Sequence, residues 1–243
     1  MSATEPIVAL DAPRGARASD DAMLLARATA GTTLSASTTM YPSSLEVVSG
    51  ALARDVPTTT TYGYVLDGRA ALRASGVSAE LPEGGYFAAP GAFTVASDGL
   101  VVLVARTGFL GLLQVGVIEA RGRLAYIDGC SDTLLVCPPR AGDPAFNHLH
   151  FPAGVTQREH LHPTVRLGVV ARGAGVARLV DGERALTRGS VFLIDAHERH
   201  AFRTTGDAMD VIAFHPDSDW GPTDAAHPMR SRTYLLTQLT RRN

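Results

Sequence analysis

The sequence predicts an all-β protein built from two tandem domains. Its 243 residues suffice for two β-domains of ordinary size, and 45% of them are hydrophobic, so each domain can form a packed core. The 24 glycines and 14 prolines are scattered along the chain, where they separate many short apolar runs. Such a texture is typical of β-strands joined by turns. An internal repeat divides these runs into two similar halves.

The repeat is visible when the chain is compared with itself, because residues 62–87 align with residues 167–192 without a gap. The identical pairs include Gly63 and Gly168, Val65 and Val170, Gly68 and Gly173, Arg73 and Arg178, Leu81 and Leu186, Gly84 and Gly189, and Phe87 and Phe192. In each copy, three strands are separated by two glycine-containing turns. We therefore expect a flexible tail over residues 1–21, a first domain over 22–115 and a second over 116–243.

Composition excludes several classes of function. The formal net charge is −2 and no block of like charge stands out, so neither nucleic acid nor a membrane surface is an expected partner. Cys130 and Cys137 are too few for a disulfide framework, which favours a reducing compartment. The chain shows no signal-like start and no apolar run long enough to cross a bilayer. We expect a soluble, cytoplasmic protein.

The two copies of the repeat differ in their histidines. All eight histidines lie between residues 148 and 227. In the first copy, Asp55, Pro57 and Val95 stand at the positions of His160, His162 and His200. The first domain is therefore expected to hold no metal and to serve packing or a dimer interface. A second site without histidine is the alternative.

His160, His162 and His200 are candidate metal ligands. His160 and His162 are two residues apart, so on a strand both imidazoles would point to the same face. His200 from a distant strand would complete a set of three nitrogen ligands for iron(II), zinc, nickel, copper or manganese. The alternative is that these are surface histidines of strands and a loop.

The spacing around these histidines resembles the first motif of the cupin superfamily. That motif is a glycine, five residues, His-x-His, three or four residues, Glu, six residues and a glycine. The chain matches it from Gly154 through His160 and His162 to Gly173, but Arg166 stands where the family has Glu.

The second cupin motif is a glycine, five residues, Pro-x-Gly, two residues and His. Gly189 and His200 fit this spacing, whereas Asp195 and His197 replace the usual Pro and Gly. The resemblance covers most of residues 45–215, and it implies two small jelly-roll barrels, that is, a bicupin.

Arg166 indicates the charge of the substrate. A guanidinium stays protonated and cannot bind a metal, so the site would combine three neutral imidazoles, a metal ion and a further positive charge. At about 5 Å and an effective dielectric near 20, one unit charge is worth about 3 kcal/mol to a bound anion. We expect Arg166 and Gln157 to bind a small anionic organic substrate. Alternatively, Arg166 pairs with one of the neighbouring acids Asp195, Glu198 and Glu159.

Two further histidines are candidate catalytic residues: His150, which could reach the surroundings of the metal, and His215, which could transfer protons. His150 lies on a predicted strand where His148 and His150 alternate with Leu149 and Phe151, and the pattern does not reveal which pair faces the metal. His215 ends a predicted strand, Val211–Phe214. Ordinary strand positions are the alternative for both.

The resemblance also implies a reaction. Cupins with three histidines and no acidic ligand include iron(II) dioxygenases, some of them bicupins. One divalent metal, iron(II) before zinc, nickel, copper or manganese, is therefore the expected cofactor, and O2 the co-substrate. The leading hypothesis is an oxygenase acting on a small carboxylate- or enolate-bearing molecule. The alternatives are a non-redox decarboxylase, isomerase or cyclase, and a non-catalytic protein that binds an anion. Since cupins are often dimers, a homodimer is expected.

Overall fold

The structure, a computed structural model, describes residues 23–218 and 220–232 of the chain. Within these ranges the chain forms β-strands in two antiparallel sheets and two short 3-10 helices, which confirms the all-β prediction. No helix in the described ranges is long and apolar enough to cross a membrane. The expected tail, residues 1–21, lies outside the described residues.

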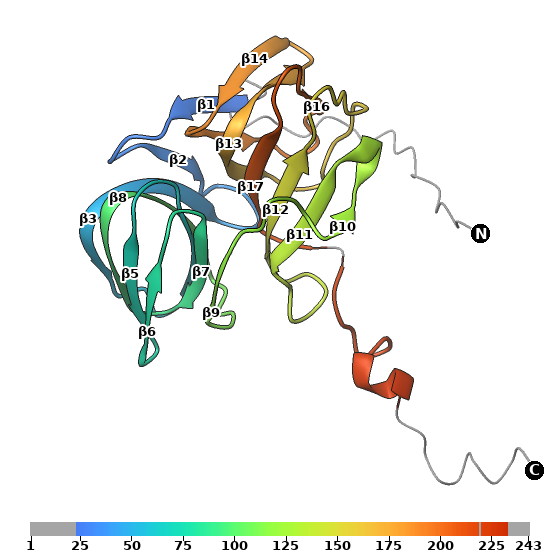
Figure 1. Ribbon diagram of the computed structural model, residues 1–243. Helices are drawn as coiled ribbons and strands as arrows, with labels where there is room; N and C mark the ends of the chain where they lie inside the picture. The colour runs from blue at the N-terminus through green and yellow to red at the C-terminus, as the bar shows by residue number, and fades with distance from the viewer. Residues whose placement is uncertain (1–22, 219, 233–243) are drawn as a thin grey trace, which may run out of the picture.

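The first sheet contains eight strands in the order β2-β3-β8-β4-β7-β9, and β5 and β6 extend it from β8. Figure 1 shows it curling into one barrel-like half of the molecule. The strands are β2 (Thr33–Ala36), β3 (Ser43–Arg54), β4 (Thr59–Val65), β5 (Ala70–Ala74), β6 (Val77–Leu81), β7 (Gly85–Pro90), β8 (Phe93–Thr107) and β9 (Gln114–Val117).

The second sheet has nine strands in the order β1-β15-β13-β17-β12-β11-β10, and β14 and β16 both pair with β13. The strands are β1 (Met23–Arg27), β10 (Leu124–Ala125), β11 (Ser131–Val136), β12 (Ala145–Phe151), β13 (Arg166–Leu179), β14 (Gly182–Thr187), β15 (Ser190–Ile194), β16 (His200–Arg203) and β17 (Met209–His215). The 3-10 helices are η1 (Ile127–Gly129) and η2 (Pro228–Arg232).

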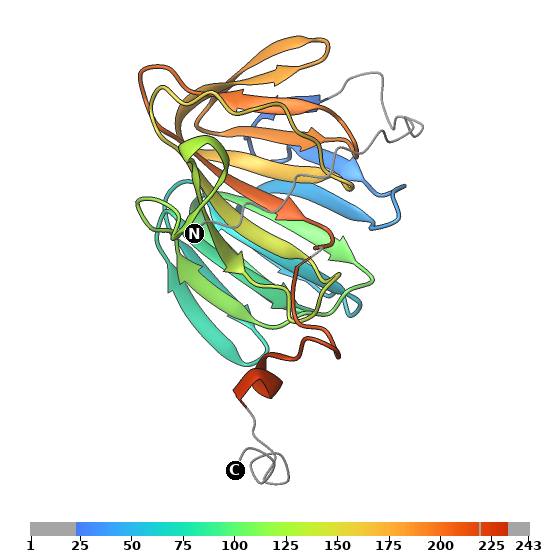
Figure 2. The same ribbon diagram turned by 90° about the vertical axis from the view of Figure 1, so that its right-hand side faces the viewer.

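The pairing of β1 differs from the expected division of the chain at residues 22 and 115. β1 pairs antiparallel with β15 of the second sheet, from Met23 opposite Ile194 to Arg27 opposite Ser190. Figures 1 and 2 both show this strand, in blue, beside the orange strands of the second half. β1 covers the edge of β15, which would otherwise expose unpaired backbone groups. At the other boundary, β9 runs two residues past residue 115 and pairs with β7.

Three apolar clusters organise the molecule. One fills the first half, around Phe87 and Val95, and a second fills the interior of the second half, around Phe151 and Phe192. The third lies between the sheets and takes side chains from both. In the third cluster the ring centroids of Tyr62 and Phe214 are 4.9 Å apart. The central strands are therefore buried on both faces; β4 is buried at every position.

The repeated glycines and phenylalanines explain why the two halves fold alike. Gly63 lies opposite Phe87 across β4 and β7, and Gly168 lies opposite Phe192 across β13 and β15. A Cβ atom would lie 2.2 Å from the Phe87 ring at Gly63 and 2.5 Å from the Phe192 ring at Gly168. Each phenylalanine ring thus occupies the space that a side chain on the opposite strand would need.

Candidate metal centre

His160, His162 and His200 come together at one end of the second barrel. One nitrogen from each ring lies within 4.8 Å of the other two. The expected strand at His160 and His162 is instead an extended loop between β12 and β13, joined to β16 by isolated bridges at Thr156–Arg203 and His160–His200. Mutual backbone hydrogen bonds of 3.0 and 2.9 Å join His160 to His200 and hold two of the three rings together.

Backbone carbonyls fix the orientation of two of these rings. The Nδ1 atom of His160 lies 3.0 Å from the carbonyl oxygen of Arg158, and that of His200 lies 2.9 Å from the carbonyl oxygen of Glu198. When Nδ1–H donates to a carbonyl, the lone pair of the imidazole is on Nε2, which is the arrangement typical of metal-ligating histidines.

The electrostatic surroundings keep the rings of His162 and His200 neutral. Burial, reinforced by His160, lowers the pKa of His200 to about 4. Burial and then the positive charge of Arg166 hold the pKa of His162 far below its usual value. Because a metal binds the neutral ring, neither histidine has to lose a proton at neutral pH before it can bind one. Three imidazole nitrogen atoms that converge in this way fit one divalent transition metal ion.

Asp128 anchors the loop that carries His160. Its carboxylate accepts hydrogen bonds from the backbone N–H of Arg158, at 2.7 Å, and from Nε of the Arg158 side chain, at 2.8 Å. Asp128 has a positive φ of 56°, a conformation that Asp tolerates better than most residues. The carbonyl that orients His160 therefore belongs to a residue held from outside the loop.

Arg166 opens β13 and lines the same pocket, with 8% of its surface exposed. Its Nη1 atom donates to the carbonyl oxygens of Thr164 and Val165, both at 3.0 Å, and to the Thr164 hydroxyl at 2.8 Å. Its charge lowers the pKa values of His162, His200 and His215. Of its expected acidic partners, Glu159 forms an ion pair with Arg199 at 3.4 Å.

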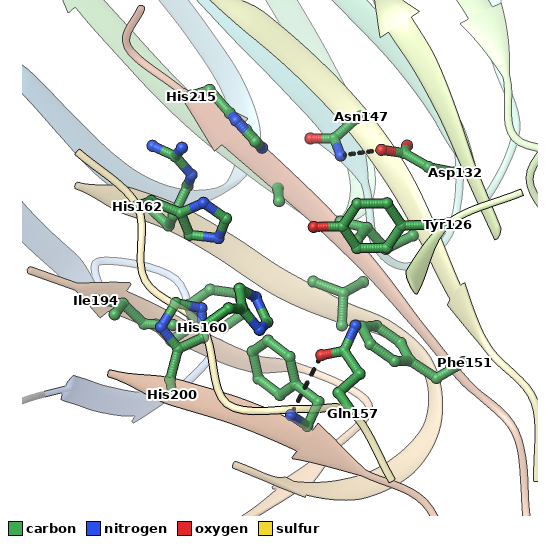
Figure 3. Close-up of a pocket in the computed structure, with 16 residues that line it drawn as sticks. Tyr126, Asp132, Asn147, Phe151, Gln157, His160, His162, Ile194, His200 and His215 are labelled. Carbon is green, nitrogen blue, oxygen red and sulfur yellow. Dashed lines mark hydrogen bonds between the residues drawn. The ribbon is translucent and has the colours of Figure 1, made fainter. Parts of the chain in front are cut away.

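Gln157 also lines the pocket, but its amide is used within the protein. Its Oε1 atom accepts a hydrogen bond from the backbone N–H of Phe202 at 3.3 Å (Figure 3). Its Nε2 atom lies 3.7 Å from Sγ of Cys130. Only 2% of the residue is exposed. Gln157 therefore ties the metal-binding loop to β16, and both ends of its amide are occupied.

The two candidate catalytic histidines lie in different places. His215 lines the pocket, and its ring centroid is 6.1 Å from that of His162. Burial and the charge of Arg166 hold the pKa of His215 well below its usual value. His150, contrary to expectation, does not line the pocket. Because side chains alternate along β12, Asn147, Leu149 and Phe151 face the pocket and His150 faces the other side.

On that other side, His148 and His150 share a carboxylate. His148 Nε2 and His150 Nδ1 lie 2.9 and 2.8 Å from Oδ1 of Asp210. Burial raises the pKa of Asp210, but the hydrogen bonds from both histidines outweigh it and hold that pKa below its usual value. Arg172 lies 3.7 Å from the same carboxylate and donates to the carbonyl oxygen of Glu119.

The cavity beside the triad is small and largely apolar. Its volume is about 110 Å³, whereas ligand pockets commonly measure about 300–1,000 Å³. The apolar wall comprises Leu149, Phe151, Phe192, Ile194, Phe202, Val211 and Ala213. Such walls limit the access of water and strengthen the interactions between charges inside the pocket.

Three polar residues that the motifs did not reveal complete the pocket: Tyr126, Asp132 and Asn147. Burial raises the pKa of Asp132 to about 6, although the hydrogen bond from Asn147 opposes this. Burial also raises the pKa of Tyr126, so its hydroxyl keeps its proton. The one sequence signal for Asn147 was the alternation of side chains along β12. This alternation did not reveal which side of the strand faces the pocket.

Comparisons with known proteins support the cupin resemblance. Residues 147–215 match the family model of the cupin domain. Three solved structures with a similar fold are a Cupin 2 conserved barrel domain protein from Leptotrichia buccalis (14% identity, 76% of this chain and 89% of that chain, TM-score 0.56), protein Ylba from E. coli (17%, 82% and 85%, 0.59) and salicylate 1,2-dioxygenase from Pseudoaminobacter salicylatoxidans with gentisate (10%, 79% and 80%, 0.58). Among curated proteins, none matched.

Proposed function

We propose that this chain is a metal-dependent cupin enzyme, namely an iron(II) dioxygenase or other oxygenase that acts on a small carboxylate- or enolate-bearing molecule. The observation that carries the proposal is the set of donors. His160, His162 and His200 converge, and they are the one group of three or more metal-binding side chains found among the described residues. Nitrogen donors without a carboxylate suit iron(II) and related transition metals. When bound, iron(II) would supply the redox chemistry that a reaction with O2 requires.

The residues around the donors support an anionic substrate. Arg166 contributes a positive charge to the wall of the pocket, where the surrounding apolar side chains strengthen its attraction for a carboxylate. His215 is neutral at pH 7 and lies close enough to His162 to offer a hydrogen bond to a molecule beside the metal. The likeness to a dioxygenase of salicylate, an aromatic carboxylate, points in the same direction.

One observation favours a second candidate, a non-redox metal enzyme such as a decarboxylase, isomerase or cyclase. Asp132 lines the pocket, and burial raises its pKa to about 6. A carboxyl group with such a pKa exchanges protons readily near neutral pH, as general acid–base catalysis requires. In this reaction the metal would act as a Lewis acid and O2 would not be consumed.

Turnover with defined metals tests the proposal. The protein is purified without added metal, its metal content is measured, and iron(II) or zinc is then loaded anaerobically. Oxygen consumption is followed with small hydroxy, keto and aromatic carboxylic acids, including salicylate and gentisate. Consumption of O2 that requires iron(II) and one of these acids supports the oxygenase. Turnover with zinc, or without O2, supports the non-redox enzyme, and binding without turnover supports a non-catalytic anion-binding protein.

Three variants, one of them a control, test whether the result depends on the site. His160→Ala should abolish stoichiometric metal binding, whereas His227→Ala, which changes an exposed histidine far along the chain, should leave it intact. Arg166→Glu should add a carboxylate beside the three imidazoles, which tightens metal binding and weakens the binding of anionic substrates. Unchanged affinity for the anion in Arg166→Glu would contradict the role of Arg166.

We also propose that the protein is cytoplasmic and forms a homodimer. Cys130 and Cys137 are both free cysteines, as expected for a protein of the reducing cytoplasm. A homodimer is the expected assembly, and light scattering from the purified protein tests it.

A further inference from the structure

The pocket has a polar wall that faces the histidine triad. Tyr126 follows β10, Asp132 lies on β11 and Asn147 lies on β12, and all three line the pocket. In Figure 3 they occupy the side opposite His160 and His200. One cavity of about 110 Å³ borders both polar regions, so a bound molecule can contact both at once.

The polar wall contains hydrogen-bond acceptors that the described part of the chain leaves unused. One hydrogen bond of 2.9 Å runs from Nδ2 of Asn147 to Oδ2 of Asp132. The remaining oxygen of each residue, Oδ1, is buried and has no hydrogen-bond partner among the described residues. Asn147 is 2% exposed, and Figure 3 shows its carbonyl oxygen directed into the space between His215 and Tyr126.

Buried oxygen atoms without a partner are rare in folded proteins, because water no longer satisfies them and the chain usually does. When such atoms line a pocket, a ligand that supplies the missing donor is the simplest explanation. Both unused atoms are acceptors, so the ligand must carry a donor. The two charged side chains of the pocket, Arg166 and Asp132, lie near the triad and in the polar wall respectively, which favours a ligand with an anionic end and a donor end.

We propose that Asn147 and Asp132 select substrates that carry a hydroxyl or ammonium group in addition to their carboxylate. The carboxylate lies towards the triad and Arg166, and the donor group reaches the polar wall. This inference rests on the proposed function and names its substrate class: short hydroxy- or amino-carboxylates. The cavity of about 110 Å³ admits molecules of this size more readily than large aromatic ones.

Matched carboxylates test the selection. The full-length protein is loaded with zinc, which avoids oxygen chemistry, and is titrated calorimetrically with two series of carboxylic acids. The acids within one series are of equal size. The shorter series is propionate, glycolate and glycine; the longer is butyrate, 3-hydroxypropionate and β-alanine. Within a series only the terminal group changes from methyl to hydroxyl or ammonium. We expect a donor-bearing acid of at least one series to bind about tenfold or more tightly than its alkyl counterpart, since it satisfies a buried acceptor.

Variants separate recognition by the wall from chelation of zinc by the donor group. Asn147→Ala removes one acceptor, and Asp132→Asn changes the other while keeping its shape; in both, the preference should fall towards unity. Thr133→Ala, a neighbour on β11 that does not line the pocket, should retain it. If only the hydroxyl acid gains affinity, the natural donor is a hydroxyl; if only the amino acid gains, it is an ammonium group.

Three outcomes would contradict the inference or the proposed anionic substrate. Equal affinity for donor and alkyl acids overturns the inference and leaves the proposed anionic substrate intact. A preference that persists unchanged in both variants assigns it to chelation and overturns the inference as well. Binding of zinc without binding of any carboxylate overturns the anionic substrate itself, and the inference with it.

Discussion

Replacing Asp132 with asparagine should stabilise the metal-free protein at neutral pH. Burial in the pocket wall raises the pKa of Asp132 from 3.8 to about 6, because the ionised carboxylate loses contact with water. A difference of about 2 in pKa, at about 1.36 kcal/mol per unit, corresponds to about 3 kcal/mol. The ionised carboxylate therefore costs the folded state about 3 kcal/mol. Asparagine has no charge, and its amide oxygen can still accept the hydrogen bond from Asn147.

The sign of this effect depends on pH. Between about pH 4 and pH 6 the folded protein keeps a proton on Asp132 that the unfolded chain has lost. Its contribution to the free energy of unfolding is therefore zero below this window and falls as the pH rises through it. His162 and His200, whose pKa values are lowered, give the opposite slope in acid, because the unfolded chain protonates them first. The difference between variant and parent isolates Asp132.

Urea denaturation in the presence of a chelator measures that difference. Asp132→Asn should match the parent protein at about pH 4 and exceed it by about 3 kcal/mol at about pH 8. Glu80→Gln, which removes an exposed carboxylate on β6, provides a control whose difference should not change across the same range. A difference that does not grow between the two pH values would refute the assignment of a buried, raised-pKa carboxyl to Asp132.

Four further substitutions, one of them a control, test other parts of the structure. Phe214→Ala, in the cluster between the sheets, should lower the free energy of unfolding by about 3–5 kcal/mol in urea denaturation. Gly168→Ala should lower it by about 1–3 kcal/mol, because the new Cβ atom meets a buried ring at 2.5 Å, whereas Gly206→Ala meets nothing within 4 Å and should change little. Asp128→Ala should weaken metal binding by about 10-fold, measured with a competing chelator, because Arg158 loses its anchor.

The fold class and the histidine triad were predictable because both depend on local spacing. Glycine at turns and alternating apolar residues mark strands wherever they occur, and the repeat marks them twice. His160, His162 and His200 sit at fixed distances from glycines of the motifs, so their convergence follows once the strands pair. The prediction that His160 and His162 lie on a regular strand was wrong; two bridges to β16 suffice to hold their loop.

Features that depend on contacts between distant strands were not predictable. β1 pairs with β15, more than a hundred residues along the chain, and nothing in its five residues indicates that partner. The pocket-facing side of β12 could not be chosen because both sides carry polar residues, His148 and His150 on one and Asn147 on the other. No sequence motif marks Asp132, because its place in the pocket arises from the pairing of β11 with β12.

The two faces of the central strands explain what the half without histidines contributes to the site. β12, β13 and β17 present Asn147, Arg166 and His215 to the pocket. An adjacent residue on each strand, respectively Phe146, Leu167 and Phe214, packs into the cluster shared with the first half. Because packed interiors resist displacement, a shift of the first half moves these strands and with them the pocket residues. The first half therefore supports the metal centre by packing against the sheet that carries the pocket residues. This role does not require the first half to supply a metal ligand.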